Sequence, residues 1–443
     1  MKGILVVLDG MGDLPNKQLG DKTPLEAAEM PNLDFLATRG ELGYMYPVKP
    51  GFIPGSDEAI VSIFGNDLIS STRGQLEARG TDLKLTRGDL ALRVNFATID
   101  NPKKGNLIDR RAGRTLTTAE AEILAKALNK IKLSCKFDFK QTIQHRAVLV
   151  LRGGFSDNVS GNDSAYSKVK SRGEDKIGTF RPQDDDENSQ YTANILKDFA
   201  DKAFEVLDKH PVNEVRRKKG LLPANYLLMR GAGIETPKLK FYKKWVSVAY
   251  MPLEVGFSRV CGMQVSSFDY PKLKNLDSYA NLMEGLEKAV KFSISVLKKN
   301  HKKTDYAYIH IKETDLPGHD NKPLEKKMML EHIDKVLFNF LRKFAPPNQI
   351  KVVVTADHST PCKLKGHSAD PVPVLFYNAS PPKSDSWRIT SFIKSAATFS
   401  NPLKKNSEPE EQKGVKFCEK TARNGKLGGF TGKELFRKVG FRN

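Results

Sequence analysis

The stretch VVVTADHSTPCKLKGHSADPVPVLFY (352–377) contains two apolar runs separated by a polar segment rich in possible metal ligands. The first run ends at Asp357 and His358, and His367 follows nine residues later. The chain has only eight histidines among 443 residues, so two of them beside one strand end need an explanation. Two interpretations stay open at this point: a metal site, or a cluster of polar side chains that satisfy one another.

Short apolar runs alternate with amphipathic helical patterns along the whole chain. The segment TTAEAEILAKALNKI (117–131) opens with a capping box from Thr117 to Glu120 and continues with apolar residues at helical spacing. The alternation predicts an α/β fold, with a mostly parallel sheet flanked by helices on both faces. The expected strands cover residues 4–8, 147–151, 226–229, 246–250, 306–311, 351–355 and 373–377.

Three of these strands are followed by an aspartate. Asp9 comes directly after the first, Asp315 follows the run YIHIKET with His319 four residues later, and Asp357 precedes His358. The carboxyl ends of parallel strands form the ligand crevice of such sheets, so the three acids are expected to converge. Buried carboxylates need a counter-charge, which divalent ions would supply. Aspartate oxygens together with imidazole nitrogens suit Mn²⁺, Zn²⁺ or Co²⁺ better than Ca²⁺ or Mg²⁺.

The segment GFIPGSDEAIVSIFG (51–65) places Ser56 at a turn ahead of an apolar helical pattern. A helix N-terminus favours anions such as phosphate, although Ser56 could also do no more than cap the helix. Beside a metal ion, a serine hydroxyl can become a nucleophile. Together with the three acids and three histidines, Ser56 would suit a pair of ions that stabilise both oxygens in phosphoryl transfer.

Bulk properties narrow the class of protein. The length suits two domains or one domain with an insertion, and no apolar run approaches the roughly 20 residues that span a bilayer. The four cysteines are scattered without a C-x-x-C pair, which predicts a reducing, cytoplasmic compartment. The net charge of +20 is dispersed among acids, so we expect neither a nucleic-acid nor a membrane partner, and no feature indicates an oligomeric state. Two polar stretches, 156–190 and 401–414, are expected to be loops, the first functional or disordered and the second exposed and mobile.

Several motifs in order along residues 3–378 carry a resemblance to a known family. They include LDGMGD, TPLEAAEMPNLDFLATRG, PGSDEA, RGQLEARGTDL, DRRAGRTLTTAEAE, QHRAVLVLRGGFSDNVSGND, LLMRGAG, HIKETDLPGHDNK and TADHSTPCKLKGHSADPVPV, and the ending GKLGGFTGKEL fits as well. The chain thereby resembles the archaeal-type cofactor-independent phosphoglycerate mutases of the alkaline phosphatase superfamily. The resemblance implies a phosphatase-like domain (1–100 and 245–443) interrupted by a smaller α/β transferase domain (101–244).

The resemblance also implies a ligand set and a cofactor. The first metal ion would be bound by Asp315, His319 and His367. The second would be bound by Asp9, Ser56, Asp357 and His358. Ser56 would be the residue that becomes phosphorylated, and 2,3-bisphosphoglycerate would not be required. We expect Mn²⁺ first, with Co²⁺, Zn²⁺ or Mg²⁺ as alternatives.

A basic set in the inserted domain would hold phosphoglycerate, the expected small-molecule substrate, because arginine forks grip carboxylate and phosphate bidentately. The alternatives are surface charge clusters, strand ends and turns. One departure from the family pattern is Glu254-Val255-Gly256, where a basic residue usually precedes the glycine. The expected substrate contacts are Arg110, Arg111, Arg114, His145, Arg146, Arg152, Asp157, Asn158 and Arg230.

The expected reaction interconverts 3-phosphoglycerate and 2-phosphoglycerate through phosphorylated Ser56, with the metal or an acid such as Asp13 or Asp157 accepting the proton of the glycerate hydroxyl. The main alternative is a metal-dependent phosphomonoesterase or phosphonate hydrolase of the same superfamily. A basic RNA- or membrane-associated protein is the alternative from a different class, and the complete ligand set argues against it.

Overall fold

The computed structural model describes residues 1–68, 72–164, 176–273, 278–379 and 415–442. They form two compact parts, residues 1–59 with 289–442 and residues 60–288, and each is described by itself. The polar stretch 156–190 is described except for its middle, and the loop predicted at 401–414 lies outside the described residues. A search of the described helices finds none that is long and apolar enough to cross a membrane.

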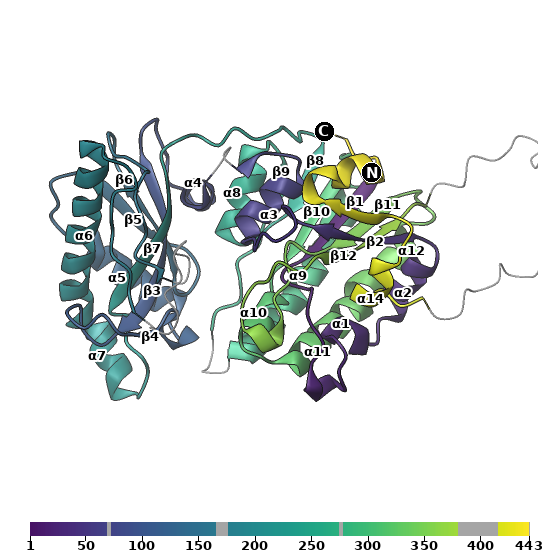
Figure 1. Ribbon diagram of the computed structural model, residues 1–443, viewed down its shortest axis with the longest axis horizontal. Coiled ribbons are helices and arrows are strands. Elements are labelled where there is room, and N and C mark those ends of the chain that lie inside the picture. The colour runs from purple at the N-terminus through teal and green to yellow at the C-terminus, as the bar shows by residue number, and fades with distance from the viewer. Residues whose placement is uncertain (69–71, 165–175, 274–277, 380–414, 443) are drawn as a thin grey trace, which may run out of the picture. The chain divides into compact units, whose positions relative to one another are not determined.

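The first part is built around three parallel strands. Strand β1 (Gly3–Leu8) lies between β10 (Tyr306–Ile311) and β11 (Lys351–Thr355) and is parallel to both. Every residue of β1 and β10 is buried, which explains why both strands are continuous apolar runs with little alternation. The register aligns the carboxyl ends of the three strands, so the residues that follow them meet at one edge of the sheet (Figure 1).

Beyond β11 the sheet continues through β12 (Val372–Tyr377), β2 (Glu41–Tyr46) and β13 (Gly428–Thr431). The β11–β12 and β12–β2 pairs are antiparallel, whereas β13 runs parallel to β2. Helix α2 (Pro31–Thr38) packs on β2 and β12 and against α12 (Asn339–Phe344). The predicted α/β fold, with a mainly parallel sheet flanked by helices, is confirmed.

The second part contains an antiparallel sheet of five strands. The long strand β3 (Leu90–Ile99) pairs with β4 (Leu107–Asp109), β6 (Arg146–Leu151) and β7 (Tyr226–Gly233), and β5 (Phe137–Gln141) pairs with β6. All ten residues of β3 are buried, because the strand has neighbours on both sides and helices on both faces.

Helices cover both faces of this second sheet (Figure 1). Helices α5 (Thr118–Leu128) and α6 (Glu187–Asp208) lie on one face, and α4 (Arg73–Arg79) packs on the other. Helix α5 begins one residue after Thr117, and the predicted capping box with Glu120 is present. The core under α5 and α6 includes Phe96, Leu124, Phe139, Leu149, Leu196 and Phe199, and complete burial of each such side chain contributes roughly 1.5–3 kcal/mol.

The division of the chain differs from the predicted one. We expected residues 101–244 as the inserted domain, whereas the second compact part spans residues 60–288. Strand β3, expected in the first part, instead pairs with β4, β6 and β7 in the second. The second part also contains β8 (Trp245–Val248), which is paired in parallel with β9 (Gln264–Ser266). A division into compact parts does not define the ends of an inserted domain, so the bounds 101 and 244 stay a prediction.

Candidate functional site

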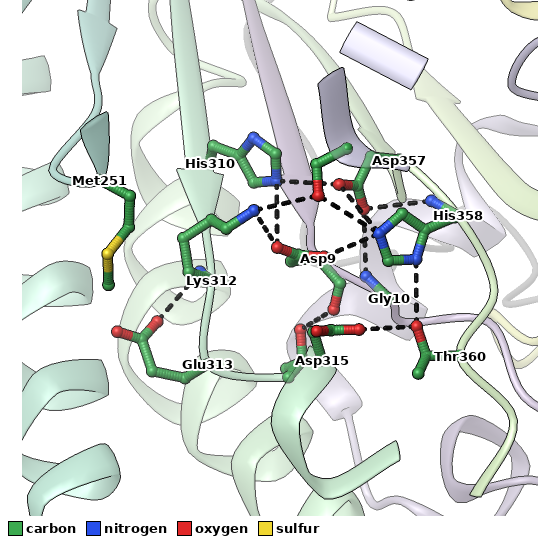
Figure 2. Close-up of polar contacts among 12 residues, drawn as sticks. Asp9, Gly10, Met251, His310, Lys312, Glu313, Asp315, Asp357, His358 and Thr360 are labelled. Carbon is green, nitrogen blue, oxygen red and sulfur yellow. Dashed lines mark hydrogen bonds and ion pairs between the residues drawn. The ribbon is translucent and has the colours of Figure 1, made fainter. Parts of the chain in front are cut away.

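Two aspartates lie side by side at the carboxyl edge of the first sheet. Asp9 follows β1 and Asp357 follows β11, and both side chains are almost completely buried. His358 Nε2 lies 3.2 Å from Asp9 Oδ1 and 3.5 Å from Asp357 Oδ2. Figure 2 shows the two carboxylates and the His358 ring converging on one small region. The structure thus brings together the two aspartates that were predicted at strand ends, as the parallel register requires.

A second cluster surrounds Asp315, the first residue of α10 (Asp315–His319). His319 Nε2 lies 3.3 Å from Asp315 Oδ2, and His367 Nε2 lies 3.7 Å from Asp315 Oδ1. The Nδ1 atoms of both histidines face main-chain carbonyl oxygens, those of Lys365 and Pro54. That contact favours the tautomer whose Nε2 is free to bind a metal ion. The His358 and His367 rings stack with their centroids 3.7 Å apart, so the two clusters adjoin.

The electrostatics of these clusters suit divalent cations. Burial, together with the charge of Asp357, raises the pKa of Asp9 well above its usual value. Burial lowers the pKa of His358 to about 3, so its imidazole is neutral, which is the form that binds metals. Among the described residues, Asp9 Oδ1 and Asp357 Oδ2 accept no hydrogen bond. Buried carboxylate oxygens without donors are costly unless a cation compensates them, so the donor set fits metal ions.

Ser56 lies beside these clusters at the first position of α3 (Ser56–Ile63). Its Oγ is 3.3 Å from His358 Nε2 and 3.4 Å from Lys312 Nζ. Glu58 Oε2 accepts a hydrogen bond from the Gly55 amide and so fixes the turn ahead of the helix. The serine therefore has both a helix N-terminus and a cation close to its hydroxyl, an arrangement that favours an anion there.

Two residues that the sequence reasoning missed also face the site. Lys312 Nζ makes an ion pair with Asp9 and reaches Ser56. His310 Nε2 lies 3.5 Å from Asp357 Oδ2, and Asp9, His310 and Asp357 offer ligand atoms within 4.8 Å of one another (Figure 2). The available signal was a lysine and a histidine at alternate positions of YIHIK, which is otherwise an apolar strand.

A buried ion pair between Lys326 and Asp13 lies next to the site and supports it. Lys326 is fully buried and donates to Asp13 Oδ2 at 2.8 Å, to the Thr360 carbonyl at 3.1 Å and to the Gly12 carbonyl at 3.3 Å. Thr360 Oγ1 in turn donates to Asp315 Oδ1 at 2.7 Å. Asp13 also accepts from the Cys362 amide. With these partners Asp13 is a structural group, and its expected role as a proton acceptor for the substrate is not supported.

Glu419, at the start of α14 (Glu419–Arg423), accepts hydrogen bonds from the Asp13 amide and the Thr23 hydroxyl. Burial raises the pKa of Glu419 to about 7, from an ordinary value of 4.5. The folded state therefore binds this proton more tightly than the unfolded state does. The stability that protonation of Glu419 contributes is fully present below about pH 4.5 and is lost as the pH rises through 7.

We therefore expect Glu419→Gln, which stays neutral at every pH, to gain stability relative to the wild type as the pH rises. The gain in the free energy of unfolding between about pH 5 and pH 8 should be about 1–3 kcal/mol. Urea unfolding of the metal-free proteins at both pH values measures it. Glu41→Gln, at an exposed position, should show no such change, and a Glu419→Gln difference that does not vary with pH would contradict the assignment.

The second part gathers several of the predicted substrate residues. Burial, with the positive charges of Arg146, Arg111, Arg93 and Arg114, lowers the pKa of His145 well below its usual value. These guanidinium groups therefore lie around a neutral, buried imidazole. Arg93 is a further member that the sequence reasoning missed.

Two more predicted arginines meet at a buried carboxylate. Arg110 makes an ion pair with Asp163, and Arg230 Nε lies 3.5 Å from Asp163 Oδ2. The side chain of Asp163 is 1% exposed, so its carboxylate contacts both guanidinium groups from the interior of the protein. A carboxylate at this position can orient two arginines toward an anionic ligand.

The other three predicted residues have structural contacts in this part. Arg152 follows β6 at the opposite end from Arg146 and bridges Asp89, at 2.6 Å, and Asp138. Asp157 Oδ2 accepts from the Ile234 amide at 3.1 Å. Asn158 Nδ2 donates to Asp184 at 2.5 Å. Their roles in substrate binding stay predictions, and the contacts of Arg152 support a structural role instead.

Known proteins are similar to most of this chain. A family model described as 2,3-bisphosphoglycerate-independent phosphoglycerate mutase matches residues 37–213. A protein of that name from Thermococcus kodakarensis is 42% identical over 386 residues, which are 84% of this chain and 87% of the relative. A Pyrococcus furiosus protein of the same name is 42% identical over 382 residues, with the same coverage of each chain.

Two solved structures share the fold. A protein of Pyrococcus horikoshii aligns with a TM-score of 0.69 at 30% identity, covering 100% of this chain and 98% of that one. The cofactor-independent phosphoglycerate mutase of Thermoplasma acidophilum aligns with a TM-score of 0.54 at 28% identity, covering 99% of each chain. The chain belongs to the family of 2,3-bisphosphoglycerate-independent phosphoglycerate mutases.

Proposed function

We propose that this enzyme interconverts 3-phosphoglycerate and 2-phosphoglycerate through a phosphorylated Ser56, with two divalent metal ions and without 2,3-bisphosphoglycerate. The observation that carries the proposal is the position of Ser56 Oγ, within 3.4 Å of both His358 Nε2 and Lys312 Nζ and beside the buried carboxylate of Asp9. A glycolytic, cytoplasmic enzyme with no nucleic-acid or membrane partner is part of the same proposal.

We assign the metal ligands to the two clusters in the way that the family resemblance implies. Asp315, His319 and His367 would hold one ion, and Asp9, Ser56, Asp357 and His358 the other. When bound, such ions lower the pKa of a hydroxyl and stabilise charge on a transferred phosphoryl group. The mixed oxygen and nitrogen donors support Mn²⁺, with Co²⁺, Zn²⁺ or Mg²⁺ as alternatives.

Ser56 and Lys312 perform the transfer. In the first half-reaction, the phosphoryl group leaves O3 of the substrate and bonds to Ser56 Oγ, while the Ser56 hydroxyl gives up its proton and O3 of the glycerate takes one. In the second, O2 of the same glycerate takes the phosphoryl group, and its proton leaves as Ser56 regains one. The ammonium of Lys312 and the N-terminus of α3 lie where the negative charge of the phosphoryl group develops, which stabilises the transition state.

Retention of glycerate separates a mutase from a phosphatase, because water attacking phosphorylated Ser56 would release inorganic phosphate. The arginines around His145 and Asp163 provide charge to hold the glycerate carboxylate. Val255 stands where the family usually has a basic residue, in the buried helix α8 (Pro252–Val260). Release of inorganic phosphate would indicate that Val255 weakens the retention of glycerate, and formation of 2-phosphoglycerate would indicate that it does not.

The test is ³¹P NMR of the purified protein with 3-phosphoglycerate and Mn²⁺, in the absence of 2,3-bisphosphoglycerate. We expect a 2-phosphoglycerate signal that approaches equilibrium with the substrate signal. Inorganic phosphate as the sole product would assign the chain to the metal-dependent phosphomonoesterases. An unchanged spectrum with Mn²⁺, Co²⁺, Zn²⁺ and Mg²⁺ in turn would overturn the proposed reaction.

Lys312→Met should lower kcat by about 10²-fold, because it removes the cation beside Ser56 Oγ while keeping the length of the side chain. Initial rates with saturating 3-phosphoglycerate and Mn²⁺ measure the change. Lys322→Met, the same substitution at a more exposed lysine, is the control and should stay within about twofold of the wild type. An equal loss in both variants would contradict a role for Lys312 in the transfer.

A further inference from the structure

Residues 112–114 form a short turn with a costly backbone. Ala112, Gly113 and Arg114 have φ angles of 47°, 68° and 58°, so three consecutive residues occupy the left-handed region. Glycine adopts this region readily, but Ala112 and Arg114 carry a Cβ atom and do not. Such a conformation persists only where the surrounding contacts enforce it, and clusters of this kind are frequent at ligand sites.

The turn carries two arginines whose charges act on His145. Arg111 precedes it and Arg114 ends it, and the charges of both lower the pKa of the buried His145 imidazole. The left-handed backbone therefore determines where two of the expected substrate-binding guanidinium groups lie. A different conformation of the turn would move at least one of them away from His145.

A buried arginine on α7 (Pro211–Lys218) holds the turn from the protein interior. Arg216 is 1% exposed, and its Nη2 donates to the Ala112 carbonyl at 3.3 Å and to Thr115 Oγ1 at 2.7 Å. Its Nη1 donates to the Thr115 carbonyl at 3.1 Å and lies 3.2 Å from both carboxylate oxygens of Glu120. The guanidinium thus spans the turn and the capping box at the start of α5.

The other side of the turn is held by Asp109, the last residue of β4. Its Oδ1 accepts hydrogen bonds from the Arg111 amide at 2.7 Å and the Gly113 amide at 2.8 Å. The Arg216 guanidinium thus bonds to main-chain carbonyl oxygens of the turn, and the Asp109 carboxylate accepts from its main-chain amides.

We propose that Arg216 is a positioning residue for substrate binding: it acts through the left-handed turn at residues 112–114 to place Arg111 and Arg114 against the anionic groups of the substrate. The proposal rests on the proposed function in one respect, that this arginine set binds phosphoglycerate. Arg216 itself is buried under the turn and does not touch the ligand.

The test compares Arg216→Met with Arg217→Met, the same substitution at the next residue of the same helix. Arg217 is 40% exposed and bonds to Asp208, so its loss leaves the turn intact. In the Arg216 variant we expect the KM for 3-phosphoglycerate to rise by about 10-fold or more, with a smaller change in kcat. Binding of Mn²⁺ should be unchanged, and Arg217→Met should match the wild type in all three measurements.

Hydrogen exchange of residues 110–116 gives a readout that does not depend on turnover. Arg216→Met should exchange faster there than the wild type, and Arg217→Met should not. Thr115→Val removes one Arg216 contact without unpairing a buried charge, so it should give a smaller change in the same direction if Arg216→Met fails to fold. A KM equal to that of the wild type in Arg216→Met would overturn the proposal. The same KM in Thr115→Val would overturn it too, if hydrogen exchange shows that the turn of this variant has loosened.

Failure of the proposed function has a different signature. If the wild type does not turn over 3-phosphoglycerate, the mutase assignment is lost, and titration calorimetry with 3-phosphoglycerate then decides the inference. Weaker binding by Arg216→Met than by Arg217→Met would support the positioning role, and equal binding would overturn it.

Discussion

Ser56→Ala is expected to lower kcat for the interconversion of the two phosphoglycerates by at least about 10³-fold, because no other described hydroxyl replaces the lost nucleophile at this position. Ser56 Oγ is the group that lies between His358 and Lys312. The fold should persist, since the Gly55 amide keeps its bond to Glu58 and helix α3 keeps its apolar face. The rate of appearance of 2-phosphoglycerate, followed by ³¹P NMR, measures the loss.

Ser62→Ala is the matched control for this change. Ser62 is a buried serine on the same helix, and its replacement should leave kcat within about twofold of the wild type. Residual activity of Ser56→Ala above about one tenth of the wild type would contradict a covalent role for Ser56, because loss of a covalent nucleophile removes far more.

Asp357→Asn is expected to remove the stabilisation contributed by the metal ion that Asp9, Asp357 and His358 would hold. A ligand that binds only the folded state, at 100 times its Kd, adds about 2.7 kcal/mol, which raises Tm by about 5–10 °C in a unit of about 150–250 residues such as the first compact part. Asp357 Oδ2 is a buried oxygen that accepts no hydrogen bond among the described residues, and the amide of asparagine lowers both the charge and the ligand strength there. Calorimetric Tm should rise clearly less on addition of Mn²⁺ in the variant than in the wild type.

Asp370→Asn provides the comparison for this variant. Asp370 lies in the same polar segment, its Oδ2 accepts from Ser368 Oγ, and it belongs to neither ligand cluster. Its Mn²⁺-dependent shift in Tm should equal that of the wild type. A full metal-dependent shift in Asp357→Asn would show that the buried carboxylates are not the metal site.

The strand-end aspartates were predictable because of a simple rule of parallel sheets. Asp9 and Asp357 each follow an apolar run, and parallel strands align their carboxyl ends, so the acids had to meet. The same rule did not single out His310, which lies inside the expected strand 306–311, or Lys312, which follows that strand but is a cation and not an acid. Their contacts depend on the neighbour β1, which lies some 300 residues earlier in the sequence.

The roles of Asp13 and Arg152 depended on partners that the sequence does not place. Asp13 ends the glycine-rich motif LDGMGD, which also contains the predicted ligand Asp9. Its partner Lys326 is 313 residues away in the sequence. Arg152 follows the same strand that begins at Arg146, and six residues of extended chain put the two at opposite ends of β6. The pairing of β3 was not predictable for a similar reason, since its antiparallel partners β6 and β7 are distant in the sequence.

The decisive measurement is the covalent state of Ser56 during turnover. The enzyme with Mn²⁺ and 3-phosphoglycerate is quenched in acid within milliseconds, digested and analysed by mass spectrometry. We expect phosphate on the peptide that contains Ser56, and none on the corresponding peptide of Ser56→Ala. Full turnover with no phosphate at Ser56, or with phosphate on another residue, would contradict this expectation.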